Sequence, residues 1–282
     1  MDTSIENFLS SHPFAETTKA KYASILINLE GLPLSDWQSA DLLNYLKSKI
    51  TWGNSTQCLA LNTIKKYLRW KYGNTHPALN TRLKKIAPRR QRTLSMDQAR
   101  DLLAMFNPHT PKGARDLAIA ALALDTGLRC SELCRLTPKD FDLDNRTLSV
   151  IVKGGQWANA VYSPATANCI YKWLAFRDPK YKTIFYSLHF SCKGHELKRE
   201  GMNTIMRYWG KSLGFKISPH DLRRSFATLT TILGAPSRIV QVAGRWSQIQ
   251  MVELYTRDID QSLITPFLPT ASLIEQIETS YQ

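Results

Sequence analysis

Apolar residues recur every three or four positions through most of the chain, a spacing that places them on one face of an α-helix. In the first third, no alternating pattern typical of a strand competes with it. Pro33, Gly53 and Gly73 separate the helical segments. The pattern predicts a compact bundle of about four helices, with its clearest periodicity in residues 17–29, 41–50 and 56–72.

Helical patterns also dominate the chain from residue 95 onward. Ser95 and Gln98 form the Ser-x-x-Gln signature of a helix start. Gly127 and Gly214 stand where helices are expected to end. The helix that carries His220 is expected to bury an apolar stripe made of Phe226, Leu229 and Leu233. Further helices are predicted at residues 95–105, 111–125, 131–136, 163–177, 199–213 and 236–243.

One stretch of the chain is β-rich instead. Residues 147–153 and 158–162 flank Gly154 and Gly155, and two strands joined by a glycine turn predict a hairpin. Residues 183–188 are expected to add a third strand. The predicted fold class is therefore mainly α with a small β-sheet, in two domains.

The net charge points to a polyanionic partner. The 282 residues carry a formal charge of +14 at pH 7. Residues 1–92 hold 14 Lys and Arg against 6 Asp and Glu, so the N-terminal third is the more densely positive part. Nucleic acid is favoured over a membrane surface because no basic amphipathic helix stands out.

Other sequence features bear on localisation. The chain lacks a run of about eighteen apolar residues that could span a membrane. Its first residues lack the basic and apolar regions of a secretory signal. The five cysteines, without a Cys-x-x-Cys pair, suggest reduced thiols, and Cys130 and Cys134 are interpreted as buried thiols rather than metal ligands. The sequence predicts a cytoplasmic protein with no membrane association and no metal site.

Two separated stretches carry residues suited to a phosphodiester. His220 and Arg223 stand three residues apart, so one helical face can present a proton carrier and a phosphate-gripping guanidinium. Further along, Trp246 offers an indole N–H and Tyr255 a phenol. A His-x-x-Arg pair alone is usually an ordinary helix surface pair. With Arg129 far upstream, however, two arginines could clamp the two non-bridging oxygens of one phosphate.

Four segments resemble, in order and in spacing, the motif boxes of the tyrosine recombinases, the family of phage integrases and Xer recombinases. They are residues 126–133 (Thr-Gly-Leu-Arg-Cys-Ser-Glu-Leu), 220–223 (His-Asp-Leu-Arg) and 244–247 (Gly-Arg-Trp-Ser), and Tyr255. The resemblance covers roughly residues 1–260. It implies a site-specific DNA recombinase or integrase that cuts and rejoins DNA through a 3′-phosphotyrosyl intermediate with strand exchange.

The resemblance also implies catalytic roles. Tyr255 would attack the scissile phosphate, Arg129 and Arg223 would hold it, and His220 would act as general acid/base. Lys153, near the turn of the predicted hairpin, would protonate the departing 5′ oxygen. The implied catalytic set is Arg129, Lys153, His220, Arg223, Trp246 and Tyr255. Glu132 is expected to orient Arg129 or a neighbouring catalytic group, with an ordinary helix-capping role as the alternative.

The third motif box departs from the family pattern. Arg245 is inserted between Gly244 and Trp246, so either residue after the glycine could fill the box. Counting back nine residues from Tyr255, the family's usual separation, reaches Trp246, which is therefore preferred to Arg245. In addition, Arg224 stands where the family often has histidine.

The resemblance extends to the domain organisation. It implies an N-terminal helical core-binding domain that binds DNA (residues 1–87), a basic linker (88–94) and a catalytic domain with a C-terminal tail helix (95–282). Phosphate contacts are expected from basic residues of the third helical segment and of the linker. These are Lys65, Lys66, Arg69, Lys71, Arg89, Arg90 and Arg92.

Partners and alternatives complete the expectation. The partner is double-stranded DNA with a specific recombination site, bound by a homo-tetramer on two duplexes, and no cofactor is expected. The tail pattern at residues 272–281 is interpreted as docking on a neighbouring protomer, with self-packing as its alternative. A type IB topoisomerase-like nicking and closing enzyme and a catalytically inactive DNA-binding relative remain as alternative functions.

Overall fold

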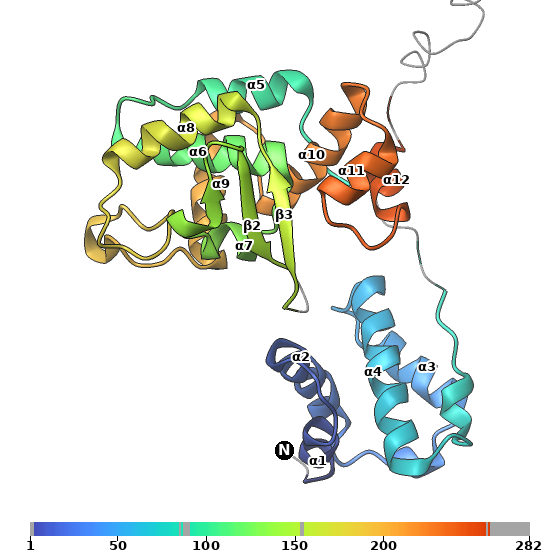
Figure 1. Ribbon diagram of the computed structural model, residues 1–282. Helices are drawn as coiled ribbons and strands as arrows, with labels where there is room; N and C mark the ends of the chain where they lie inside the picture. Colours follow the sequence, from blue (N-terminus) through green and yellow to red (C-terminus); the bar gives the residue numbers. More distant parts are fainter. Residues whose placement is uncertain (1–2, 85, 87–90, 153–154, 258, 260–282) are drawn as a thin grey trace, which may run out of the picture. The chain divides into compact units, whose positions relative to one another are not determined.

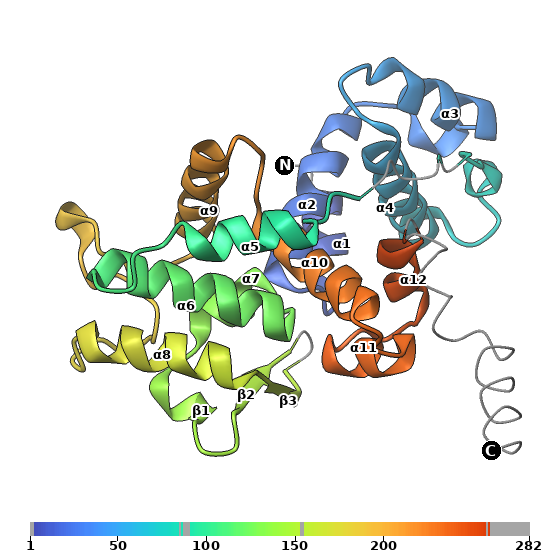
Figure 2. The ribbon, with the colours of Figure 1, turned by 90° about the horizontal axis from the view of Figure 1, so that it is seen from above.

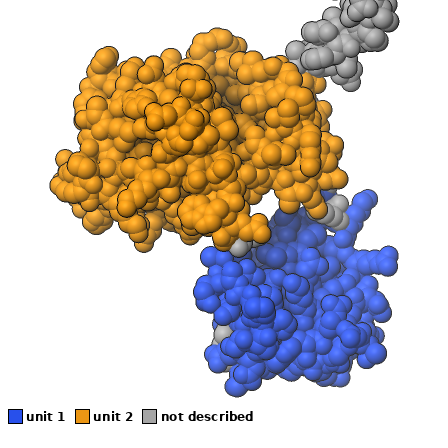
Figure 3. All heavy atoms as spheres, in the orientation of Figure 1, with its two compact units in different colours: residues 1–89 blue, residues 90–282 orange. Residues whose placement is uncertain are grey.

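The structure, a computed structural model, describes residues 3–84, 86, 91–152, 155–257 and 259. It divides into two compact units, residues 1–89 and 90–282 (Figure 3). The predicted basic linker, residues 88–94, spans the boundary between them. Four predicted features lie outside the described residues, namely Lys153, Arg89, Arg90 and the tail helix at 272–281.

The first unit is a small helical bundle. Its longest helix, α4, packs against the other three, and the core between them includes Phe8, Leu26, Leu42 and Ile64. The described helices are α1 (Thr3–Ser10), α2 (Glu16–Leu26), α3 (Ser39–Ser48) and α4 (Asn54–Tyr72), joined in part by short 3-10 turns. The periodicity predicted α2, α3 and α4, and α1 completes the expected four.

The second unit is organised around α6. This helix is rich in alanine and buried on nearly all sides, and α5, α8 and α10 pack against it (Figures 1 and 2). Small side chains allow these neighbours to approach closely. The helices are α5 (Met96–Ala104), α6 (Pro111–Thr126), α7 (Cys130–Arg135), α8 (Pro164–Phe176), α9 (Arg199–Leu213), α10 (Pro219–Ile232), α11 (Ser237–Ala243) and α12 (Gln250–Thr256). Among the described residues, no helix is both long and apolar enough to cross a membrane.

A three-stranded antiparallel sheet covers one side of this unit. Its strands are β1 (Phe141–Asp142), β2 (Thr147–Ile151) and β3 (Trp157–Val161), in the order β1-β2-β3. In its register, Val150 lies opposite Ala158 and Leu148 opposite Ala160. Leu148, Val150 and Ala160 are buried and join the core of α6 and α8. The mainly helical fold class with a small sheet is therefore confirmed.

The predicted third strand at residues 183–188 is wrong. That segment forms only an isolated bridge between Tyr186 and Glu196, and the short β1 takes its place in the sheet. The apolar pattern of Ile184 to Tyr186 reflects burial in the hydrophobic core. The Ile184 N–H donates to the Leu136 carbonyl, and the Ile184 carbonyl accepts from the Trp173 indole, so its backbone is satisfied without a strand partner.

The predicted stripe of the His220 helix needs one correction. Phe226 and Leu229 are buried, but Leu233 is 71% exposed. The helix ends at Ile232, so Leu233 follows its last turn and no longer continues the buried face. Phe226 belongs to a separate apolar cluster that joins α10, α11 and α12, whose buried members are Phe226, Ala227, Val240, Trp246, Val252 and Tyr255.

Gly127 connects α6 to this region. It adopts a left-handed conformation with φ of 57°, and a Cβ atom at this position would lie 2.5 Å from the Phe226 ring. The residue therefore needs to be glycine for two reasons, backbone conformation and close packing. Gly214 ends α9 with φ of 77° but has open space where a Cβ would stand.

We expect Gly127→Ala to lower the free energy of unfolding by about 2–4 kcal/mol, because left-handed strain and overpacking add. Gly214→Ala is the matched control and should cost about 1–2 kcal/mol, since it introduces only the backbone strain. Urea denaturation followed by tryptophan fluorescence measures both. Equal costs in the two variants would show that the contact with Phe226 has no energetic weight.

Candidate active site

The first arginine of the site is positioned by the break between α6 and α7. Gly127 ends α6, and Arg129 is the N-cap of α7. Glu132, on the first turn of α7, accepts from the Arg129 backbone N–H at 2.7 Å and from its guanidinium at 2.8 Å. The Glu132 side chain is 3% exposed and that of Arg129 is 36% exposed. A buried carboxylate thus holds a guanidinium whose other face meets solvent.

Arg223 is held differently, by neutral groups. Its side chain is buried on α10, where it donates to the Gly127 carbonyl and, at 2.7 Å, to the Gly244 carbonyl. Its guanidinium carbon lies 4.4 Å from the centre of a Trp246 ring. Burial and then the nearby charge of Arg129 lower the pKa of Arg223 to about 9, so it remains protonated at neutral pH. Within the described part of the chain, no carboxylate pairs with this charge.

These arginines line one pocket of about 470 Å³, together with His220. The pocket also receives Arg199 and Asn203 from α9. None of its lining residues is acidic; the remaining ones are Cys130, Ser131, Ser218 and Pro219. Segments almost a hundred residues apart in sequence therefore converge on one positively charged cavity, which suits an anion.

His220 lies on the first turn of α10. Ser218 caps this helix, and Pro219 occupies its first position, a favoured place for proline. Although the His220 side chain reaches the surface, partial desolvation lowers its pKa below the ordinary 6.5, and the positive charges of Arg224 and Arg223 lower it further. His220 is thus neutral at physiological pH and able to accept a proton.

Asp221, next to His220, is the centre of a buried polar network. Its carboxylate is 2% exposed and accepts from Arg92 at 2.6 and 3.1 Å and from the Ser218 hydroxyl at 2.7 Å. Arg224 adds a longer contact of 3.5 Å. The sequence predicted Arg92 as a phosphate contact, whereas the structure pairs it with Asp221. The network fixes the start of α10 and hence the position of His220.

Tyr255 and Trp246 lie behind the pocket rather than on its wall. Trp246 packs against Tyr255 with ring centres 5.9 Å apart, and Arg224 approaches the Tyr255 ring at 5.9 Å. Both aromatic residues are buried, and neither lines the cavity. The Trp246 indole lies so close to Gly244 that a Cβ there would meet it at 1.8 Å. Arg223 is thus linked to Tyr255 through Trp246.

Arg245 also reaches the site. Its backbone is left-handed, with φ of 56°, and its guanidinium donates to the carbonyls of Thr126 at 2.8 Å and Ala243 at 2.7 Å. Burial is the main cause that lowers its pKa, and Glu132 and Arg129 are close enough to influence it. The Nε–H groups of Arg224 and Arg245 are buried and have no acceptor in the described part of the chain. Both candidates for the third box therefore adjoin Arg223 or Arg129.

The DNA-contact candidates of the first unit lie on α4. The Lys65 ammonium donates to the Thr81 carbonyl, and burial lowers its pKa. Lys66 lies 3.4 Å from the Tyr22 hydroxyl, and Arg69 is exposed. Lys71 contacts the Tyr67 hydroxyl at 3.4 Å. Lys66 and Arg69 are thus better placed than Lys65 to meet a phosphate, and DNA contact by all four residues stays a prediction.

Arg199, Asn203 and Ser218 line the pocket but were not singled out in the sequence. They lie in no motif box, and the spacing from Arg199 to His220 carries no recognisable signal. The basic character of the predicted helix at 199–213 is the sequence feature that relates this segment to an anion site.

Comparison with known proteins agrees with this architecture. The sequence model of the phage integrase family matches residues 92–262, more than half of the chain. The chain therefore belongs to the phage integrase family. The match includes every described residue of the candidate active site.

Relatives within this family are tyrosine recombinases. Tyrosine recombinase XerC of Actinobacillus pleuropneumoniae serotype 7 is 28% identical over 191 residues, which are 67% of this chain and 62% of the relative. XerC of Pelotomaculum thermopropionicum is 31% identical over 206 residues, 70% of this chain and 67% of that protein. The matched part thus spans slightly less than two thirds of the first of these relatives.

Solved structures share the fold. The Tn1549 transposon integrase in complex with transposon right end DNA superposes with a TM-score of 0.75 at 15% identity, covering 96% of this chain and 99% of that one. The XerH site-specific recombinase bound to a palindromic difH substrate gives 0.71 at 20% identity, covering 92% and 80%. At these identities the similarity establishes the fold.

We expect the imidazole of His220 to titrate below pH 6.5 and Arg224→Gln to raise its pKa, because removing a positive charge makes the imidazolium less unfavourable. Any step that needs neutral His220 should therefore persist as pH falls to 6.5 and decline only below it. NMR titration, with the signal assigned by its loss in His220→Gln, measures the pKa. Lys172→Gln, an equal charge change on α8, should leave it unchanged. A pKa at or above 6.5 would contradict the expectation.

Proposed function

We propose that this protein is a site-specific DNA recombinase of the tyrosine recombinase type, which cuts and rejoins DNA through a 3′-phosphotyrosyl intermediate. One observation carries the proposal. Arg129 and Arg223, from separate segments, line the same cavity as His220. The Arg223 side chain contacts Trp246, which in turn contacts Tyr255.

The electrostatics of the cavity favour a phosphodiester. The Arg223 guanidinium donates hydrogen bonds to two carbonyl oxygens. The carboxylate of Glu132 already accepts a hydrogen bond from Arg129. A buried charge without a counter-ion is costly, so a bound phosphate would recover part of that cost. Two guanidinium groups provide paired N–H donors for the two non-bridging oxygens. These donors would also stabilise the extra negative charge of the transition state.

The proposed first step is an in-line displacement at phosphorus. The Tyr255 oxygen forms the new bond to phosphorus, the bond from phosphorus to the 5′ oxygen breaks, and the DNA 3′ end remains on the tyrosine. His220, neutral at physiological pH, accepts the phenolic proton. Since Tyr255 is buried beside Trp246, we propose that α12 shifts when DNA binds and brings the phenol to the pocket.

Lys153 is assigned the proton for the departing 5′ oxygen, which leaves as a hydroxyl. The 5′ hydroxyl of a second duplex then attacks the phosphotyrosine and reverses these steps on a new partner. The phosphotyrosine conserves the energy of the broken phosphodiester bond. The reaction therefore needs no nucleotide cofactor as an energy source, and the chemistry proposed here uses protein groups only.

The proposed substrate is double-stranded DNA with a specific recombination site, cut by a homo-tetramer that holds two duplexes. The formal charge of +14 supports a DNA partner. Relatives support it too, because the XerH and Tn1549 integrase structures are described as complexes with DNA. The first unit is proposed to bind the same duplex through Lys66 and Arg69, and the linker through Arg89 and Arg90.

The central test traps the intermediate. Nicked suicide duplexes, taken from DNA flanking the gene and from a pool of randomised sequences, should give a protein–DNA adduct that survives denaturation. Tyr255→Phe should remove the adduct because it lacks the attacking oxygen. Mass spectrometry of the adduct should place the nucleotide on Tyr255. Adduct formation that persists in Tyr255→Phe would contradict the assignment. Tyr281→Phe, which alters the other C-terminal phenol, is the control.

A second test decides between the two third-box candidates. If Trp246 fills the box, Trp246→Phe should keep the packing but lose the indole N–H, and the cleavage rate on the suicide duplex should fall about tenfold or more. Arg245→Gln should then have a smaller effect. The reverse order would assign the box to Arg245. Circular dichroism of both variants checks that neither has merely unfolded.

A further inference from the structure

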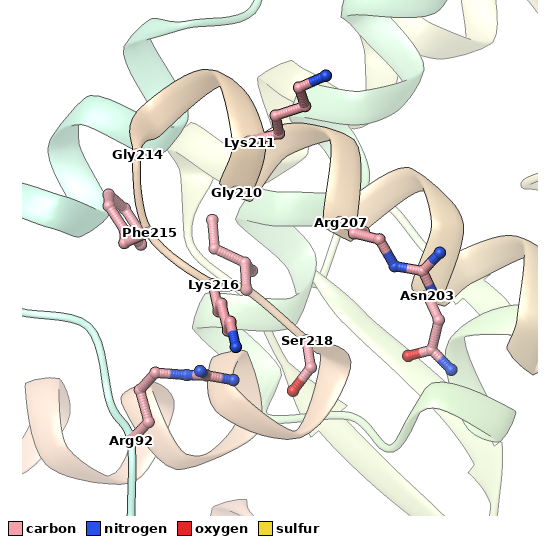
Figure 4. Close-up of a pocket in the computed structure, with 10 residues that line it drawn as sticks. Arg92, Asn203, Arg207, Gly210, Lys211, Gly214, Phe215, Lys216 and Ser218 are labelled. Atoms are coloured by element: carbon pink, nitrogen blue, oxygen red, sulfur yellow. The ribbon is translucent and has the colours of Figure 1, made fainter.

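A second basic cavity adjoins the proposed phosphate pocket. It measures about 640 Å³ and lies between the C-terminal half of α9, the segment that leads to α10, and Arg92 (Figure 4). Its charged lining residues are Arg92, Arg207, Lys211 and Lys216, and none of the other lining residues is acidic. In Figure 4, Arg92, Lys216 and Ser218 gather at one side of the cavity, and Arg207 and Asn203 project from α9 at the other.

Two glycines build this cavity. Gly214 ends α9 in a left-handed conformation that turns the chain back. Gly210 then allows the returning segment to lie against the helix, because a Cβ at Gly210 would stand 2.4 Å from the Phe215 carbonyl oxygen and 2.9 Å from the Ile217 nitrogen. This close return sets Lys216 opposite Arg207. The cavity therefore follows from specific backbone geometry and is more than a chance cluster of surface lysines.

Three of the four cations that line this cavity have no carboxylate partner in the described part of the chain. Arg207, Lys211 and Lys216 are exposed and form no ion pair within the described residues. The fourth cation, Arg92, binds Asp221, which accepts from the Ser218 hydroxyl as well. The cavity thus has a net positive charge, and the cationic groups of three side chains are available to a ligand.

The two cavities are neighbours. Asn203 and Ser218 line both of them, so the cations of one cavity lie next to those of the other. Cations distributed over two adjoining cavities suit a chain of phosphates better than a single small anion. Duplex DNA carries one negative charge per roughly 1.7 Å of its axis, so the phosphates beside a bound one lie within reach.

We propose that Arg207 and Lys216, with Lys211 and Arg92 at the margins, form a second backbone subsite that binds DNA phosphates flanking the scissile phosphate. The proposal rests on the proposed function, since it takes the ligand of the first pocket to be DNA. Phosphate contacts of this kind fix the register of a duplex and contribute no base recognition. The subsite would hold the strand so that one phosphodiester faces Arg129, His220 and Arg223.

The test is the salt dependence of duplex binding in the full chain. A fluorescent duplex of about 30 base pairs of arbitrary sequence is titrated at several salt concentrations, with Tyr255→Phe in every protein so that cleavage does not contribute. Arg207→Gln combined with Lys216→Gln should reduce the slope of log K against log salt by about two, and weaken binding roughly tenfold at the lower salt concentrations.

The control is an equal change of charge elsewhere in the same unit. Lys172→Gln with Lys182→Gln removes two exposed cations that line neither cavity. This pair should change the slope little. Chemical acylation of the chain without these substitutions gives an independent measurement, because the duplex should protect Lys216 and leave Lys172 and Lys182 reactive.

The outcomes separate the subsite from the proposed function. Equal losses in the two double variants, together with no protection of Lys216, overturn the subsite and leave DNA cleavage standing. A selective loss supports the subsite even if no Tyr255 adduct forms, in which case only the cleavage chemistry is overturned. Failure of every protein, including the Tyr255→Phe parent, to bind duplex overturns both.

Discussion

The site depends on one buried charge, that of Arg223, which forms no ion pair with a carboxylate in the described part of the chain. Arg223 is fixed by the carbonyls of Gly127 and Gly244, one at the end of α6 and the other at the end of α11. These two contacts bring distant parts of the second unit to a common point. Because dipoles rather than a carboxylate hold the guanidinium, its charge remains available to a ligand. Both carbonyls belong to glycines, because a Cβ atom would overlap the Phe226 ring at Gly127 and the Trp246 ring at Gly244.

The aromatic cluster beside Arg223 joins this arginine to Tyr255 through side-chain packing. The Arg223 guanidinium lies over a Trp246 ring, and Trp246 packs edge to face against Tyr255. Thr228 of α10 donates to the Tyr255 carbonyl at 3.0 Å, which ties α12 to the helix that also carries Arg223. The Tyr255 side chain is therefore buried in this cluster and does not line the cavity. In the proposed function, this places the nucleophile under the control of a small helix.

Much of this architecture was readable from the sequence. Helical spacing and glycine positions predicted the major helices, and the motif boxes predicted that Arg129, His220 and Arg223 meet. This prediction rested on the order and spacing of the boxes, which resemble those of the tyrosine recombinases. Glu132 contacts the Arg129 guanidinium and also caps α7 through the Arg129 backbone N–H, so the expected contact and the capping alternative are both present. Lys153 lies outside the described residues, so its place in the site remains a prediction.

The rest depends on tertiary packing, which local patterns do not encode. The segment at 183–188 has the apolar composition of a strand because it lies in the core, and its backbone bonds to side chains and to backbone groups outside the sheet. Leu233 continues an apolar period past the point where the helix stops. Arg92 and Asp221 are 129 residues apart, and nothing in either local sequence announces their bond. Arg199 and Asn203 likewise acquire meaning only when α9 packs beside α10.

The bond between Arg92 and Asp221 has a mechanical consequence. Arg92 comes shortly after the boundary at which the chain divides, and Asp221 is covalently adjacent to His220. Leu94 is anchored to the same helix, because its N–H donates to the Ser225 hydroxyl at 2.7 Å. Residues near the start of the second unit are therefore fixed to the helix that carries the imidazole by an ion pair and a hydrogen bond. Without Arg92, the buried Asp221 carboxylate would lose its shortest ion pair directly beside the residue that carries the imidazole.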